Sequence, residues 1–263
     1  MTTAAALRRE LKQSGTPERA AGAARFFKTG PGEYGEGDVF LGVTVPEVRR
    51  IVRRYRALSL AEVERLLASA EHECRLAALL ILVAQFERGD EAARRGIFDF
   101  YLLNTRYINN WDLVDCSCRE IVGEHLKTRS KKLLTRLAKS ASLWERRIAM
   151  VSTMALVWQG ETDEALRLAE ALLDDERDLI HKAIGWVLRE VGDEDRAALL
   201  RFLKQHYDRV PRTALRYAIE HFSLAERKRM LAGAFPPSVS LVRRQSPELR
   251  SARDGRGSPR APR

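Results

Sequence analysis

The feature that most constrains the fold is a set of related helical segments that return along the chain. Apolar residues recur with a helical period, and almost no segment shows the apolar–polar alternation of a strand. Four segments, at 74–79, 146–150, 181–185 and 211–215, place a basic residue before small and apolar positions. Taking Arg75, Arg147, Lys182 and Arg212 as anchors gives spacings of 72, 35 and 30 residues. A period near 35 predicts an all-α chain, an α-solenoid of stacked helix pairs.

Such an array presents a long concave surface, and a basic residue that returns once per repeat would line it. We therefore expect Arg147, Lys182 and Arg212 to line a basic concave groove. The plainer alternative is that each of these residues is an ordinary solvated helix charge. Their recurrence favours the groove.

The net positive charge of the chain favours a polyanionic partner, but the charge is distributed unevenly along the sequence. The 263 residues carry a formal net charge of +10, which favours nucleic acid because Lys and Arg contacts to phosphate release counterions. Residues 234–263 hold seven Arg against one Glu and one Asp, a net +5. We expect one folded domain over residues 1–233, followed at 234–263 by a disordered basic tail rich in Pro, Ser, Gly and Arg.

The cysteines and the N-terminal segment favour a cytoplasmic protein without a structural metal. Three cysteines, with no secretory segment, suggest reduced thiols. Cys116 and Cys118 have C-x-C spacing, which is neither a redox C-x-x-C motif nor, with His125 nearby, a complete zinc site. No apolar run is long enough to span a membrane.

Gly30, Gly32 and Gly35 spell G-x-G-x-x-G, the pattern of a dinucleotide-binding turn. That turn needs a strand before it and a helix directly after it. Here the preceding residues 23–27 suggest a helix, and the next helix is expected only near Pro46. The sequence therefore predicts a flexible connection and no nucleotide site.

The segment 109–115 carries the most specific chemistry. Trp111 and Asp115 stand four residues apart at the expected start of a helix, so they share one face. A π-face beside a carboxylate suits a cation or a developing positive charge. Ordinary alternatives exist: Asn109 or Asn110 as a helix cap, the aspartates as partners of the helix dipole, and the tryptophan as a core residue.

At these residues the chain resembles the AlkD-like family of DNA alkylation repair glycosylases, which are built from HEAT-like repeats. The resemblance spans roughly residues 5 to 232, and its W-D-x-V-D and K-A-I-G-W-x-L-R-E elements are specific in that order. The matching segments are 28–30 with 40–49, 111–115, 144–147 and 182–190.

The resemblance implies a role for each matching residue. Asp115 would be the catalytic carboxylate, Trp111 and Trp186 would flank the sugar of the lesion, and Arg147 would hold the DNA backbone. Where some members have a tyrosine, this chain offers Phe26, or Phe27 as the less favoured choice. The resemblance also implies that the base is not extruded into a pocket.

We therefore expect a monomeric N-glycosylase without cofactor that releases cationic 3-methyladenine and 7-methylguanine from duplex DNA. An alkylated purine is already a good leaving group, so stabilising the oxocarbenium-like sugar and orienting water is the remaining task. Two alternatives stay open: a noncatalytic HEAT-like module that binds damaged or branched DNA, and a protein-binding α-solenoid scaffold. Asp115 together with both tryptophans and Arg147 favours the enzyme.

Overall fold

The structure is a computed structural model that describes residues 2–236. The basic tail expected at 234–263 lies, from residue 237 on, outside the described residues. By their contacts the residues divide into two compact units, one ending at His125 and one beginning at Leu126.

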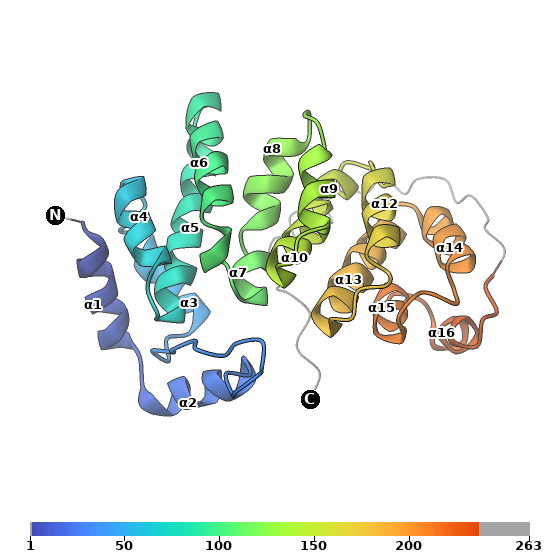
Figure 1. Cartoon of the computed structure of the whole chain (residues 1–263), viewed down its shortest axis with the longest axis horizontal. Coiled ribbons are helices and arrows are strands. Elements are labelled where there is room, and N and C mark those ends of the chain that lie inside the picture. Colours follow the sequence, from blue (N-terminus) through green and yellow to red (C-terminus); the bar gives the residue numbers. More distant parts are fainter. Residues whose placement is uncertain (1, 237–263) are drawn as a thin grey trace. The chain divides into compact units, whose positions relative to one another are not determined.

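Both units are helical (Figure 1), and within residues 2–236 the β-pairing is limited to an isolated parallel bridge between Val39 and Glu71. The first unit holds α1 (Ala4–Ser14), α2 (Pro17–Phe26), α3 (Val45–Val52), α4 (Leu60–Leu67), α5 (His72–Arg88), α6 (Glu91–Leu103), η1 (Thr105–Tyr107), α7 (Trp111–Asp115) and η2 (Arg119–Gly123). The helical turn α8 (Glu124–Leu126) stands at the division. The predicted all-α class is confirmed, and the arrangement is consistent with an α-solenoid of helical repeats.

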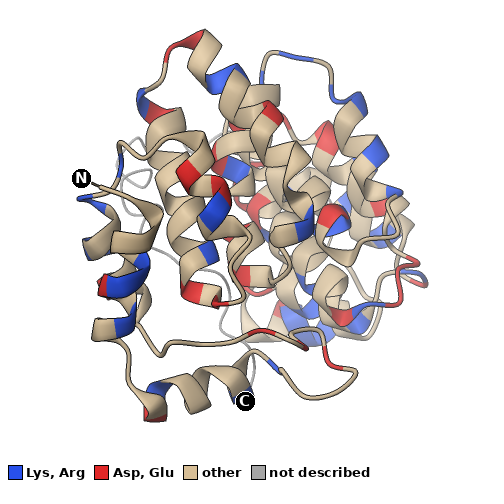
Figure 2. Ribbon diagram, turned by 60° about the vertical axis from the view of Figure 1, so that its left-hand side comes forward, with Lys and Arg blue, Asp and Glu red and all other residues tan. Residues whose placement is uncertain are grey.

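The second unit continues with α9 (Lys132–Ala138), α10 (Leu143–Ser152), α11 (Met154–Val157), α12 (Asp163–Ala171), α13 (Asp178–Glu194), α14 (Arg196–Gln205), α15 (Arg212–Ala218) and α16 (Leu224–Leu231). Across the described residues, no helix combines the length and apolar character needed to cross a membrane. Basic and acidic residues are interspersed along the helices (Figure 2).

Side-chain caps explain where many of these helices begin. Thr3, Thr16 and Ser59 in the first unit, like Ser142 and Asp195 in the second, accept a hydrogen bond from a backbone N–H of the first turn. These N–H groups have no partner inside the helix, so each cap contributes about 1 kcal/mol.

One long helix forms the centre of each unit. In the first, α5 packs against α3, α4 and α6, and its residues are buried on all sides from His72 to Leu82. In the second, α13 packs against α10, α12, α14 and α15. Each fully buried Leu or Ile on these helices contributes roughly 1.5–3 kcal/mol.

A repeated side-chain N–H donor lies four residues after the N-cap of α5, α10 and α13. Arg75, Arg146 and His181 each bind the backbone carbonyl six residues earlier: the carbonyls of Ser69, Ser140 and Asp175. These positions are 71 and 35 residues apart, which agrees with the predicted period near 35. The bound carbonyls belong to the turn before each helix, so the contact fixes how each helix enters its repeat.

The anchors chosen from the sequence are therefore partly out of register. Arg147 and Lys182 follow the structural anchors by one residue, and Arg212 is the first residue of α15. The expectation that the recurring residue lines a surface is wrong for Arg75, which is 4% exposed. Its guanidinium instead binds Asp38 at 2.5 Å and the carbonyls before α5.

Candidate functional site

The short helix α7 carries both Trp111 and Asp115, as the i, i+4 spacing predicts. Asn110 is its N-cap: the Asn110 Oδ1 accepts the backbone N–H of Trp111 at 2.8 Å. The Asn110 Nδ2 donates to Asp38 Oδ2 at 3.0 Å, which ties the start of α7 to the loop before α3. The expected cap at Asn109 or Asn110 is thus resolved in favour of Asn110.

An aromatic cluster supports the Trp111 ring. Phe27 stacks on Trp111 with ring centroids 5.3 Å apart and 23° between the planes. Phe27 also stacks with Phe40, with ring centroids 5.0 Å apart. Phe26 meets Trp111 edge to face at 5.9 Å. Trp111 itself is partly exposed. It is therefore not an ordinary core tryptophan, because one part of its ring is packed and another part faces solvent.

The two phenylalanines at the end of α2 have different surroundings. Phe26 is 47% exposed, whereas Phe27 is packed between Phe40 and Trp111. Phe26 is thus the more exposed ring of the pair, and its place beside the DNA stays a prediction. The loop holds this arrangement closely: a Cβ on Gly35 would lie 2.3 Å from the Phe27 carbonyl oxygen.

The glycine-rich segment has the context expected of a non-nucleotide loop, with α2 before it and α3 beginning only at Val45. It is, however, bound more closely than a flexible connection. The N–H groups of Gly30 and Gly32 donate to Glu33 and Glu36, and the N–H of Gly35 donates to the Lys28 carbonyl. These hydrogen bonds hold the conformation of the loop that connects the Phe26–Phe27 pair to Asp38.

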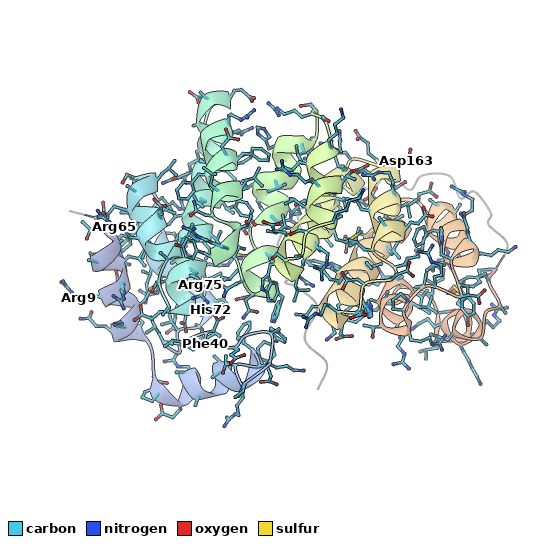
Figure 3. All side chains as sticks on the ribbon, viewed as in Figure 1. Arg9, Phe40, Arg65, His72, Arg75 and Asp163 are labelled. Carbon is cyan, nitrogen blue, oxygen red and sulfur yellow. The ribbon has the colours of Figure 1, made fainter. Side chains whose placement is uncertain are left out.

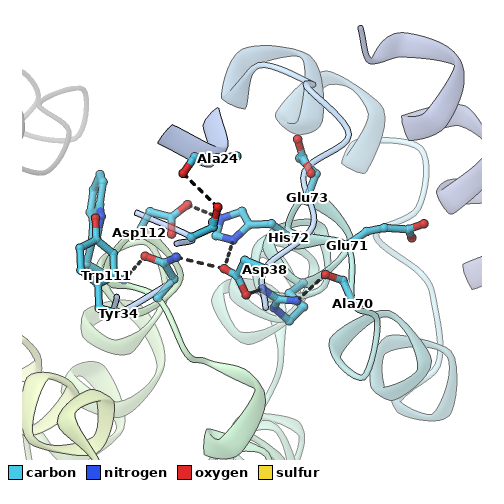
Figure 4. Close-up of polar contacts among 12 residues, drawn as sticks. Ala24, Tyr34, Asp38, Ala70, Glu71, His72, Glu73, Trp111 and Asp112 are labelled. Carbon is cyan, nitrogen blue, oxygen red and sulfur yellow. Dashed lines mark hydrogen bonds and ion pairs between the residues drawn. The ribbon is translucent and has the colours of Figure 1, made fainter. Parts of the chain in front are cut away.

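Beneath Trp111 lies a buried cluster of charges (Figure 4). His72 stands between two carboxylates, with Nδ1 3.1 Å from Asp38 Oδ2 and Nε2 2.8 Å from Asp112 Oδ2. Arg75 binds the other oxygen of Asp38 at 2.5 Å. Figure 3 shows Phe40, His72 and Arg75 grouped around the first turn of α5. Two acids thus face two cations.

The charges of this cluster shift one another's pKa values. Burial alone would lower the pKa of His72, but the charge of Asp112 and the hydrogen bonds to Asp112 and Asp38 outweigh it and raise the pKa to about 9. Burial likewise acts to raise the pKa of Asp38. The hydrogen bond with His72 and the charge of Arg75 outweigh that effect, so the pKa of Asp38 lies below its ordinary value.

Asp115 ends α7 and is 9% exposed. It lies one turn after Trp111, so the two side chains belong to one helical face. A mostly buried carboxylate is rare unless it is paired or has a function, because removing its charge from water is unfavourable.

In the second unit, Arg147 is 3% exposed and its Nη1 donates to the Leu179 carbonyl at 2.5 Å. Leu179 lies in the first turn of α13, the helix that carries Lys182 and Trp186. Arg147 therefore links α10 to α13. This contact gives Arg147 a structural task.

Trp186 is partly exposed on α13. The preceding Gly185 permits close contact with α15, since a Cβ there would lie 2.5 Å from the Ala214 carbonyl oxygen. Lys182 pairs with Asp178 at 2.8 Å, and the exposed Arg212 donates to the Leu231 carbonyl at 2.8 Å. Both basic side chains thus have protein partners, with their nitrogens near the surface.

With this geometry established, the family can be assigned. The sequence model of the family described as "DNA alkylation repair enzyme" matches residues 7–222. The chain belongs to the DNA alkylation repair enzyme family. This confirms the AlkD-like family predicted from its motifs. A search among curated proteins finds no match.

A solved structure from Enterococcus faecalis, described as a predicted DNA alkylation repair enzyme, has a similar fold. It superposes with a TM-score of 0.63 and 20% identity, covering 80% of this chain and 98% of its own. At this identity the likeness shows the fold alone.

Sequence reasoning missed the roles of His72, Asp38 and Asp112. A signal was present: His72, Glu73 and Arg75 are polar residues directly before the apolar run 76–84 of the same helix. Polar groups in such a position are buried, and buried polar groups need partners. Asp38 lies 34 residues before His72, and no local spacing pairs residues that far apart.

Proposed function

We propose that this DNA alkylation repair enzyme is a monofunctional glycosylase. It hydrolyses the N-glycosidic bond of cationic alkylated purines, 3-methyladenine and 7-methylguanine, in duplex DNA. The observation that carries the proposal is α7 itself, which combines a partly exposed, ring-supported Trp111 with the carboxylate of Asp115 one turn later.

The chemistry needs little more than this pair. Alkylation at N3 or N7 makes the purine cationic, so the base departs without a general acid. The sugar left behind resembles an oxocarbenium ion, as in glycoside hydrolysis. Ionised Asp115 stabilises that sugar and orients the attacking water. Trp111, with Phe26 at its edge, contacts the cationic nucleotide through cation–π and C–H/π interactions worth roughly 0.5–2 kcal/mol each.

In this proposal, residues of the second unit contact the sugar and the phosphates of the DNA. Trp186 is the second aromatic beside the sugar, and Arg147, Lys182 and Arg212 bind phosphates of a basic groove. The exposed Arg212 and the partly exposed Trp186 support these roles. The buried contact of Arg147 with Leu179 supports a structural task as well. The enzyme acts as a monomer, needs no cofactor and leaves the base outside any pocket.

The direct test is incubation of the purified protein with methylated duplex DNA, followed by chromatography of released bases. Release of 3-methyladenine and 7-methylguanine by the wild type, and none by Asp115→Asn, is the expected result. Tight binding to the same DNA without release would instead indicate a noncatalytic DNA-binding module. If the protein neither binds this DNA nor releases a base from it, the result would favour a protein-binding scaffold.

A further inference from the structure

His72 has a geometry that only its charged form satisfies. Both ring nitrogens face carboxylate oxygens, of Asp38 at 3.1 Å and of Asp112 at 2.8 Å, and the side chain is 2% exposed. An ionised carboxylate only accepts hydrogen bonds, so both nitrogens donate only when the imidazole is protonated.

The surroundings keep this charge in place. The ring stacks on Phe40 at 4.6 Å and meets Phe27, from the end of α2, at 5.0 Å. Its charged neighbours come from three elements: Asp38 from the loop before α3, Arg75 from α5 itself and Asp112 from α7. The two acids balance the two cations, so none of the four charges is buried without a partner of opposite sign.

Three contacts of His72 connect it to Trp111 or to the neighbours of Trp111. Asp112 follows Trp111 in sequence and is bound directly. Asn110 precedes Trp111 and is bound through Asp38. Phe27, which touches the imidazole ring, also stacks on the indole of Trp111.

We propose that His72 is a positioning residue, which fixes the first turn of α7 and so sets Trp111 and Asp115 for the reaction; this rests on the proposed glycosylase function. A helix of five residues is not stable in isolation, because its few hydrogen bonds do not offset the free-energy cost of helix nucleation. The order of α7 therefore depends on contacts made from outside it. His72 reaches both neighbours of Trp111, directly or through one carboxylate.

Single-turnover release of 3-methyladenine from an oligonucleotide duplex tests the proposal. His72→Gln keeps one donor and loses the second, so the rate should fall about 10- to 100-fold, the loss expected when reacting groups are misplaced by about 1 Å. Affinity for the duplex should change much less. His221→Gln is the matched control, because His221 also binds an aspartate, Asp193, but is exposed and belongs to the second unit.

A second readout does not depend on activity. The chain has four tryptophans, whose indole N–H resonances can be followed by NMR and assigned by substitution. In His72→Gln the Trp111 resonance should move or broaden, while those of Trp144, Trp158 and Trp186 keep their positions. Asp112→Asn removes the carboxylate charge from the same contact on the α7 side and should reproduce both effects if His72→Gln does not fold. The double variant should lose no more than His72→Gln alone.

The two proposals fail in different ways. If the wild type releases no methylated base, the proposed function is wrong, and His72 is judged by the Trp111 resonance alone. If the wild type is active, the positioning role is overturned when either the rate or the Trp111 resonance of His72→Gln stays at the wild-type value.

Discussion

Asp115 is the residue on which the proposed chemistry depends, and its substitution separates charge from shape. Asp115→Asn keeps the size of the side chain but removes the charge that stabilises the sugar cation. Base release should fall by a factor worth roughly 2.7–4 kcal/mol, the loss seen for other preorganised stabilising groups. Affinity for methylated duplex should stay within a few-fold of wild type. Single-turnover kinetics with a binding titration measure both, and normal excision would reduce Asp115 to a helix-terminus residue.

Arg147 has two tasks to separate, the observed contact with Leu179 and the proposed contact with a phosphate. Arg147→Ala leaves the Leu179 carbonyl without this donor, which should lower the free energy of unfolding by about 1–3 kcal/mol. Loss of one phosphate contact should also make the slope of log affinity against log salt shallower by about one. Arg201→Ala, an exposed arginine of the same unit, controls for the lost charge. A wild-type salt slope in Arg147→Ala would leave Arg147 only its structural task.

At the scale of elements, Gly185 sets the approach of α13 to α15. Gly185→Ala would place a Cβ 2.5 Å from the Ala214 carbonyl oxygen, so α15 must shift and stability should fall by about 1–3 kcal/mol. Gly96→Ala is the matched control on α6, where a Cβ meets nothing within 4 Å. It should gain roughly 0.5–1 kcal/mol from the better helix propensity of alanine. Denaturant unfolding measures both, and equal effects of the two substitutions would contradict the close packing.

The charge cluster between α5 and α7 predicts a pH-dependent stability. The folded pKa of His72 is raised to about 9 from an ordinary value of 6.5. Its stabilising contribution is therefore complete below pH 6.5 and is lost as the pH rises toward 9. The difference in unfolding free energy between wild type and His72→Gln should shrink over that interval. Urea unfolding at several pH values measures it, and a constant difference would mean that the imidazole is not charged in the folded protein.

The sequence predicted the kind of element better than the contacts between elements. Helical periodicity gave the all-α class, and Asn110 marked the start of α7 because a capping side chain acts on its own neighbours. Arg147 and Lys182 stand one residue after the residues that recur in the structure, because the predicted anchors are defined by their small and apolar neighbours. In the structure the recurring residue is the fourth after the N-cap of its helix. The bond between His72 and Asp38 joins residues brought together only by packing of the loop on α5.

In the proposed mechanism of the enzyme, no residue is dedicated to protonating the departing base. Catalysis must then rely on the positive charge that the lesion already carries. The charge of the lesion, more than its shape, should decide what the enzyme excises. Neutral lesions such as hypoxanthine and uracil need protonation or strong hydrogen bonding at the base before they depart.

Release from matched duplexes that each carry a single lesion tests this claim most directly. The account predicts release of 3-methyladenine and 7-methylguanine from duplex DNA, weaker activity on single strands, and little release of hypoxanthine or uracil. Efficient release of uracil or hypoxanthine would require a site that reads and protonates the base, and would contradict a mechanism driven by the charge of the lesion.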